Sequence, residues 1–199
     1  MKASELIDRL RLAVETPTVY AKGGWGQWVS DSWIKSMQLL YPSWYASHGD
    51  HLRTRIGCAA FDCVCLVKSV LWGWDADKTS PTGGAKYGSN GVPDTTAEGM
   101  IEACDCSGGW DDLEPGELLY LPGHVAVYIG DGKVIEANLT DDEDGVCMIP
   151  LSKRSWTRHG RMPWVEYDLT PADDGGEDRT VRIELTIGPD GTITGARLV

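Results

Sequence analysis

The segment Phe61-Asp62-Cys63-Val64-Cys65-Leu66-Val67-Lys68-Ser69-Val70-Leu71 places a cysteine where a helix is expected to begin. If that helix starts at Asp62, a single apolar stripe runs along it, formed by Cys63, Leu66, Val67, Val70, Leu71 and Trp74. Cys63 then faces whatever the helix packs on, while Cys65 lies about 200° further round. Asp62 is a good N-cap, and the unpaired N–H groups and dipole of a first turn favour thiolate. Cys63 is therefore our candidate nucleophile.

The composition is that of a soluble globular domain with an appendage, because 199 residues include 42% hydrophobic and 24% charged ones. A formal net charge of −12 repels phosphate, which argues against nucleic acid and anionic membranes as partners. Residues 4–15 have the pattern of an amphipathic surface helix, not of a signal peptide. We expect a protein made in the cytoplasm, with its six cysteines as thiols.

Helical periodicity fills the first half of the chain. Residues 30–41 and 96–104 repeat apolar side chains at helical spacing, as residues 4–15 do. Residues 43–60 predict a less regular bridge. Two glycine-rich segments predict loops, a short one at 19–27 and a longer one at 73–94 that could form the wall of a cleft.

From Glu117 onward the apolar period changes to 2, which indicates a sheet. Residues 117–121, 124–129 and 133–138 predict successive antiparallel strands, 147–151 a fourth strand and 156–167 a closing segment. Helices followed by strands predict an α+β domain over residues 1–167, with helices packed on one sheet face. Residues 168–178 predict an acidic linker and 179–199 a β-hairpin. A lone hairpin is marginal, so we expect it to dock on the main domain or on a second copy.

A cysteine nucleophile needs a base, and the base needs a third group that fixes its ring. His124 is the best candidate base because it heads an apolar strand directly after Pro122-Gly123. The other histidines, His48, His51 and His159, lie in polar, irregular segments where solvated side chains are the expected state.

The length of the turn after residue 129 decides which side chains share a sheet face with His124. A two-residue Asp131-Gly132 turn would give His124 only apolar neighbours on the next strand. A three-residue loop would place Asn138 opposite His124 and Glu136 one step diagonal, within reach of a glutamate. The residues alone leave the choice between Glu136 and Asn138 open.

Four motifs in this order resemble the NlpC-type branch of the papain-like cysteine peptidases, bacterial and phage enzymes that cut the peptide stems of peptidoglycan. They are Tyr20-x-x-Gly23-Gly24, Phe61-Asp62-Cys63, Pro115-Gly116-Glu117-Leu118, and Gly123-His124-Val125-Ala126-Val127-Tyr128-Ile129-Gly130 followed by Val134-Ile135-Glu136-Ala137. The resemblance covers about residues 3–167 and implies a papain-like fold without cofactor or metal.

Carried over residue by residue, the resemblance implies Cys63 as nucleophile and His124 as base. It places Glu136 where the family has its third polar residue, which favours Glu136 over Asn138. Tyr20 matches a tyrosine that helps to bind the oxyanion beside the Cys63 N–H. Asp62 matches a residue with a capping and substrate-amine-binding role. The implied scissile bond joins γ-D-glutamate to a diamino acid in a stem peptide.

Two features depart from the family pattern. Val64-Cys65 follows the cysteine where Ser-Gly is more usual, so the start of the helix could differ. Residues 25–60 form a longer connection than usual, which could redraw the substrate groove.

Other functions compete with this interpretation. The cysteine spacing fits structural zinc poorly, because paired ligands usually lie two to four residues apart. Amidase-like relatives, which cut between sugar and peptide, and acyltransferase relatives keep the same order of Cys, His and acid. A phage virion or wall-binding protein with a structural papain-like domain is the non-enzymatic alternative. Our preferred setting is a phage or prophage protein that acts in lysis or in the virion. The hairpin over residues 179–199 could contact either the virion or a second copy of the chain, and the sequence leaves this choice open.

Overall fold

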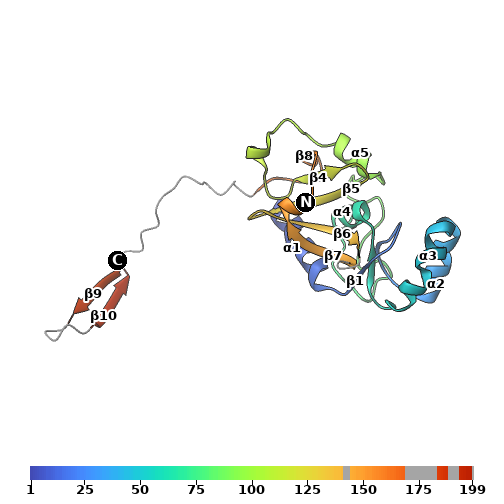
Figure 1. The fold of residues 1–199 in the computed structure, drawn as a ribbon, viewed down its shortest axis with the longest axis horizontal. Helices are drawn as coiled ribbons and strands as arrows, with labels where there is room; N and C mark the ends of the chain where they lie inside the picture. Colours follow the sequence, from blue (N-terminus) through green and yellow to red (C-terminus); the bar gives the residue numbers. More distant parts are fainter. Residues whose placement is uncertain (141–143, 169–182, 188–192, 199) are drawn as a thin grey trace. The chain divides into compact units, whose positions relative to one another are not determined.

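The computed structural model describes residues 1–140 and 144–168, together with the backbone of residues 183–187 and 193–198. The chain divides into two compact units, Met1–Leu169 and Thr170–Val199 (Figure 1). In the second unit, β9 (Ile183–Ile187) pairs antiparallel with β10 (Ile193–Leu198). Beyond Asp168 the predicted linker lies outside the described residues. The division into domain, linker and hairpin, and the docking of the hairpin, stay predictions.

The main sheet has five antiparallel strands in the order β7-β6-β5-β4-β8. Their alternating sequences place apolar side chains on both faces, which explains why the sheet is buried on each side. The strands are β4 (Leu118–Leu121), β5 (His124–Gly130), β6 (Lys133–Leu139), β7 (Asp144–Pro150) and β8 (Arg158–Gly160). The four strands and the closing segment predicted from residue 117 onward are therefore present.

Two helices, α1 (Ala3–Glu15) and α4 (Cys63–Leu71), pack against this sheet through one large apolar core. The predicted stripe of α4 lies in that core, since Leu66, Val67 and Val70 are almost completely buried. The opposite sheet face carries a smaller cluster around Leu119 and Ile149. Helices and antiparallel strands in this arrangement confirm the predicted α+β class.

A second, three-stranded sheet was not predicted. In it β3 (Ala59–Phe61) lies between β1 (Thr18–Tyr20), which runs parallel to it, and β2 (Trp25–Trp28), which runs antiparallel. The prediction of a loop over residues 19–27 was therefore wrong at both ends, which belong to β1 and β2. Strands this short have no readable period, and their hydrogen bonds come from partners distant in the sequence.

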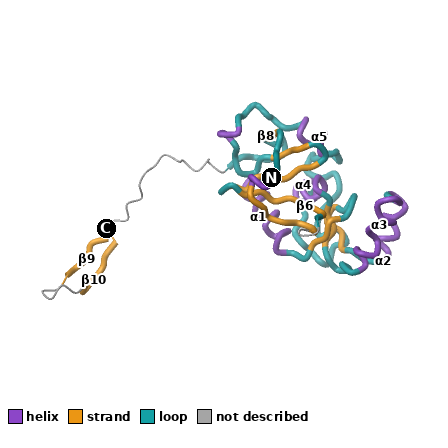
Figure 2. The backbone as a smooth tube through the Cα atoms, viewed as in Figure 1, coloured by secondary structure: helices purple, strands orange, loops and turns teal. Residues whose placement is uncertain are grey.

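The prediction of an irregular bridge over residues 43–60 was also wrong. Pro42 ends α2 (Asp31–Leu40) and at the same time begins α3 (Pro42–Arg53), because a proline is well suited to the first helical position. The two helices lie side by side (Figure 2) and enclose a separate apolar cluster with β1 and β3. This helical pair occupies most of the long connection noted in the sequence.

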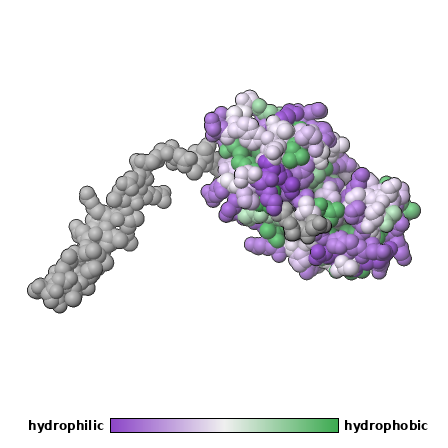
Figure 3. Space-filling model, viewed as in Figure 1, coloured by the Kyte–Doolittle hydropathy of each residue, from purple (hydrophilic) through white to green (hydrophobic). Residues whose placement is uncertain are grey.

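The remaining connections are short helices and turns. They include α5 (Ala97–Glu102) and two 3₁₀ turns, η1 (Trp110–Asp112) and η2 (Leu151–Lys153). Residues 73–94 form the predicted loop, held to the domain where the Trp72 indole donates to the carbonyl of Val92. On the face drawn in Figure 3, hydrophilic residues surround small apolar patches. No helix in the described part of the chain is long and apolar enough to cross a membrane.

Candidate active site

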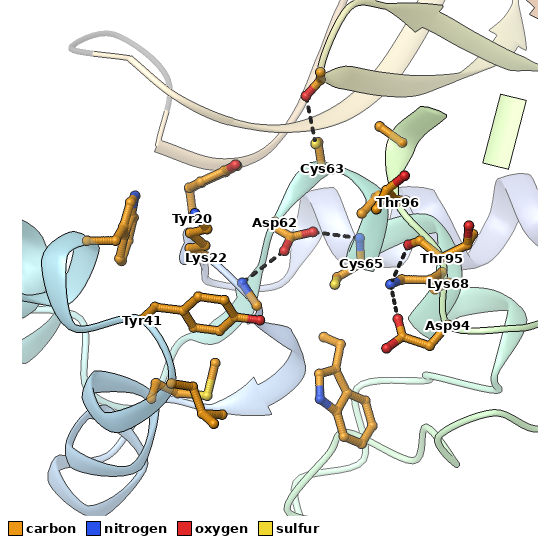
Figure 4. A pocket seen from close by; sticks show the side chains of 18 of the residues that line it. Tyr20, Lys22, Tyr41, Asp62, Cys63, Cys65, Lys68, Asp94, Thr95 and Thr96 are labelled. Carbon is orange, nitrogen blue, oxygen red and sulfur yellow. Dashed lines mark hydrogen bonds and ion pairs between the residues drawn. The ribbon is translucent and has the colours of Figure 1, made fainter. Parts of the chain in front are cut away.

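The pairing of β1 with β3 brings Tyr20 to the start of α4. Tyr20 is the register partner of Phe61, and Phe61 is followed directly by Asp62 and Cys63. Side chains that are far apart in the sequence thus meet at one strand end, around the cavity drawn in Figure 4.

Asp62 caps α4 and also fixes the glycine turn beside it. Its Oδ1 accepts a hydrogen bond from the N–H of Cys65 at 2.7 Å, and its Oδ2 accepts one from the N–H of Gly23 at 2.9 Å (Figure 4). Gly23 has a φ of 74°, and a Cβ on Gly24 would lie 2.8 Å from the backbone of Ala60. Both positions need glycine, for conformation and for close approach respectively. The N-cap prediction for Asp62 is confirmed.

The thiol of Cys63 lies against the backbone on either side of His124. Cys63 is 7% exposed, and its Sγ is 3.9 Å from the carbonyl oxygen of Gly123. Burial raises the pKa of Cys63 to about 11, and the charge of Asp62 adds to this, while N–H groups of Val125, Val64 and Cys63 itself lower it. The N–H groups of the helix start favour thiolate, as expected, but desolvation outweighs them, so the thiol of the resting protein is protonated.

His124 is oriented by Glu136. The Nε2 atom of His124 lies 2.7 Å from Oε2 of Glu136, whose side chain is completely buried. The ring of Trp156 stacks on the imidazole, with 5.9 Å between centroids and 17° between planes. Because Nε2 faces the carboxylate, Nδ1 is the ring nitrogen left to act on the thiol.

A β-bulge decides this pairing. Gly130 pairs with Lys133 across a two-residue turn, but the register shifts between Tyr128 and Gly130, so that Tyr128 pairs with Val134. Continued along the strands, this register puts Asn138 opposite His124 and Glu136 one step diagonal. The structure therefore combines the two-residue turn with the strand parity of the three-residue loop.

The predicted site residues form two groups. Tyr20, Asp62 and Cys63 line the cavity, whereas His124, Glu136 and Asn138 are not among its lining residues. No hydrogen bond between the Cys63 thiol and the imidazole is present among the described residues, although Gly123 lines the cavity next to Cys63. Catalytic hydrogen bonds often tighten only when substrate is bound. Asn138 is half-buried on β6, where it pairs with Gly145.

Tyr20 lines the cavity together with Cys63, and its hydroxyl is protonated. Burial raises the pKa of its hydroxyl well above the ordinary value, and the nearby Cys63 and Asp62 raise it further. A phenol of raised pKa keeps its O–H and can donate to developing negative charge.

The cavity has a volume of about 810 Å³ and continues from Cys63 between two aromatic walls. One wall comes from the α2–α3 pair and its junction, with Met37, Leu40, Tyr41 and Trp44. The other comes from β2, the end of α4 and the loop after it, with Trp25, Trp72 and Tyr87 in mutual ring contact. The long connection over residues 25–60 thus builds one side of the groove and supplies Trp25 to the other.

A charged pair, Lys68 and Asp94, lines part of the groove. Lys68 is 3% exposed and donates to Asp94 and to the carbonyl oxygen of Thr95 (Figure 4). Asp94 also accepts a 2.6 Å hydrogen bond from the Tyr87 hydroxyl. Burial raises the pKa of Asp94, but the bonds from Lys68 and Tyr87 outweigh it and lower that pKa overall.

No model of a known protein family matches this sequence, and no curated protein matches it. Similar solved structures exist. The peptidoglycan hydrolase RipB from Mycobacterium tuberculosis is 19% identical with a TM-score of 0.45, over 83% of this chain and 67% of that one. The P60 domain of an antigen from M. avium subspecies paratuberculosis is 18% identical with a TM-score of 0.44, over 83% and 96%. NlpC1 from Trichomonas vaginalis is 12% identical with a TM-score of 0.44, over 80% and 43%, so this chain spans less than half of its length. A likeness of this size assigns no activity.

Sequence reasoning missed two residues near His124. Arg154 makes a forked ion pair with Glu136, and Glu98 accepts a hydrogen bond from the N–H of Gly123 at 3.0 Å. Arg154 follows a 3₁₀ turn and Glu98 lies in a short helix, and neither has a local pattern that points to His124. Only the folded chain brings them there.

His159 was expected to be solvated, and this was wrong. It is 5% exposed on β8, and its Nδ1 lies 2.5 Å from Oε2 of Glu117. His48 stacks on Trp44 and His51 pairs with Asp144. Within the described residues, no three or more His, Cys, Asp or Glu side chains are grouped so as to hold a metal ion.

Proposed function

We propose that this protein is a cysteine hydrolase that cuts an amide bond in the stem peptides of peptidoglycan, with Cys63 as nucleophile, His124 as base and Glu136 as the residue that orients the base. The observation that carries the proposal is the position of the Cys63 thiol at the start of α4, against the backbone that flanks a histidine held by a buried glutamate. The sequence resemblance supports the same three roles.

In the proposed reaction the resting thiol is protonated, so proton transfer accompanies attack. Nδ1 of His124 takes the thiol proton as Sγ bonds to the amide carbon, and the carbonyl electrons move onto oxygen. The N–H of Cys63 and the hydroxyl of Tyr20 donate to this oxyanion. The imidazolium then gives its proton to the departing amine, the C–N bond breaks, and water hydrolyses the thioester by the reverse proton transfers.

The groove supports a peptide substrate with charged ends. Aromatic walls accept aliphatic stems, and Asp62, with its carboxylate at the cavity wall beside Cys63, is suited to an amine. The proposed bond joins γ-D-glutamate to a diamino acid, and Asp62 receives the free amine of the residue that precedes the glutamate. This finer assignment rests on the sequence resemblance.

The test is hydrolysis of defined muropeptides followed by mass spectrometry of the fragments. We expect wild type to release the diamino-acid half, and Cys63→Ala to be inactive with an unchanged melting temperature. Cys58→Ala is the matched control, because Cys58 is a thiol outside the cavity. Wall-lytic activity that survives Cys63→Ala would overturn the enzymatic proposal. A cut between N-acetylmuramic acid and alanine would replace endopeptidase by amidase.

We further propose a phage or prophage setting, in which the protein acts in lysis or as a virion component. Its strongly acidic composition and the wall substrate proposed above are compatible with both roles. Immunodetection in purified virions supports the virion role, and detection only in lysing cells supports the lytic one. Absence from both would refute the setting.

A further inference from the structure

Glu136 serves two partners at once. Its Oε2 lies 2.7 Å from Nε2 of His124 and also 2.7 Å from Nε of Arg154. Its Oε1 lies 2.9 Å from the same Nε, and Nη2 of Arg154 donates to it as well. The glutamate side chain is completely buried, whereas that of Arg154 is 23% exposed. The guanidinium therefore contacts both oxygens of the buried carboxylate, including the one that faces the imidazole.

We propose that Arg154 is a positioning residue that holds Glu136 as a carboxylate and so keeps the proton of neutral His124 on Nε2, leaving Nδ1 open to the thiol of Cys63. This inference rests on the proposed function, because it assigns Arg154 a part in preparing the base. Arg154 itself does not touch the thiol or the groove.

The charge on Glu136 decides which ring nitrogen carries the proton. A carboxylate only accepts hydrogen bonds, so the imidazole nitrogen facing it must be the one that donates. A neutral carboxyl group can donate instead, which permits the opposite tautomer with the proton on Nδ1. In that tautomer Nδ1 cannot accept a proton from Cys63.

Arg154 is needed because the site is buried. Burial by itself raises the pKa of Glu136, and the hydrogen bonds from His124 and Arg154 outweigh it, so that the pKa lies below its ordinary value. His124 alone cannot supply the required positive charge, because the ring must be neutral to accept the proton of the thiol. Arginine is always charged, and its planar fork matches both carboxylate oxygens.

The other described group that faces Glu136 from a neighbouring strand is Cys147, its register partner on β7. From β5 it is faced by His124, and from the segment after η2 by Arg154. That segment also carries Trp156, whose ring covers the imidazole. One short stretch, residues 154–156, thus restrains both members of the His124–Glu136 pair.

The experiment compares wild type with Arg154→Gln and Arg154→Lys by ¹⁵N NMR of the His124 ring, without substrate. Arg161→Gln is the matched control, because Arg161 also pairs with a glutamate through Nε and Nη2, but at an exposed site and through Oε2 of Glu114 alone. We expect the Nε2–H tautomer in wild type, in the control and, as the major form, in Arg154→Lys. In Arg154→Gln we expect a substantial Nδ1–H population.

A second readout is the pH dependence of hydrolysis. Loss of the cation raises the pKa of Glu136, so the acid limb of kcat/KM moves upward by about one pH unit or more in Arg154→Gln. In Arg154→Lys the acid limb should lie close to its wild-type position, because lysine keeps the positive charge. A purely structural role of Arg154 would not predict this rescue. An unchanged tautomer together with an unchanged acid limb in a folded Arg154→Gln protein overturns the proposal.

Wild type alone also tests the inference if Arg154→Gln does not fold. A ¹³C titration should find Glu136 ionised below the ordinary glutamate pKa of 4.5, with the proton of neutral His124 on Nε2. Protonation of Glu136 above that value, or an Nδ1–H ring, refutes the role of Arg154. These spectra do not depend on hydrolysis. Failure of the peptidoglycan assay would therefore refute the proposed function but would not decide whether Arg154 positions Glu136.

Discussion

Replacing Asp62 should lower stability and raise thiol reactivity at the same time. Asp62→Ala removes the N-cap bond to Cys65 and the bond to Gly23. The cap contributes about 1 kcal/mol and the second charged hydrogen bond about 1–2 kcal/mol, so unfolding should become easier by about 2–3 kcal/mol. For a chain of this length, that corresponds to a fall in melting temperature of about 4–12 °C.

The same substitution should make the Cys63 thiol more reactive. The Asp62 charge is one cause of the raised pKa of Cys63, about 11, so its removal lowers that pKa. Each unit of decrease raises the thiolate fraction at neutral pH about tenfold. Asp62→Asn removes the charge but keeps an oxygen that can cap the helix. It should therefore raise the reactivity of Cys63 as much as Asp62→Ala does, with a smaller loss of stability.

The assay is alkylation by iodoacetamide at pH 7.5, with each cysteine followed by peptide mapping, alongside thermal unfolding by circular dichroism. Cys58 is an internal control, because Asp62 does not influence its pKa. We expect faster labelling of Cys63 in both variants and unchanged labelling of Cys58. If Asp62→Ala loses stability as calculated but labels Cys63 no faster than wild type, the electrostatic reasoning is refuted.

Three further predictions concern the groove and the core. Asp94→Asn leaves the buried Lys68 without its counter-ion and should cost about 1–2 kcal/mol at pH 7 by urea unfolding, discounted because Asp94 is half exposed. The pKa of Asp94 is lowered in the folded protein, so its contribution to stability is present above the ordinary value of 3.8 and is lost as the pH falls through the lowered value. A difference in unfolding free energy between wild type and variant that grows in acid would contradict this. Leu40→Ala should raise KM for muropeptides with little change in melting temperature, because Leu40 lines the cavity and is 69% exposed. Leu39 is 84% exposed and lies outside the cavity, so Leu39→Ala should change neither KM nor the melting temperature. Equal effects of the two variants on KM would show that the α2–α3 wall is not part of the substrate site. Gly26→Ala should destabilise the protein by more than about 2 kcal/mol in thermal unfolding, because the φ of residue 26 is 97° and a Cβ would lie 2.3 Å from the buried ring of Trp74. A variant as stable as wild type would show that the Trp74 ring moves aside without cost.

Local patterns in the sequence were sufficient to predict several helices, strands and caps. The helical stripe of residues 63–71, the cap at Asp62 and the period-2 strands after residue 117 each depend on neighbours within a few positions, so their pattern is visible in the chain. The same local signals singled out Cys63 and His124 as the chemically interesting pair. Short strands such as β1 and β3 carry no such signal, and their pairing, which brings Tyr20 beside the start of α4, depends on residues about 40 positions apart.

The partners of His124 and the protonation of the Cys63 thiol, in contrast, depend on the packing of the whole domain. A bulge between Tyr128 and Gly130 sets the strand parity that brings Glu136 to His124, and a bulge is a departure from local regularity that no period reveals. Arg154 reaches the same glutamate from a different segment. The protonated state of Cys63 follows from burial, which is a property of the packed domain and outweighs the helix start that the sequence displays.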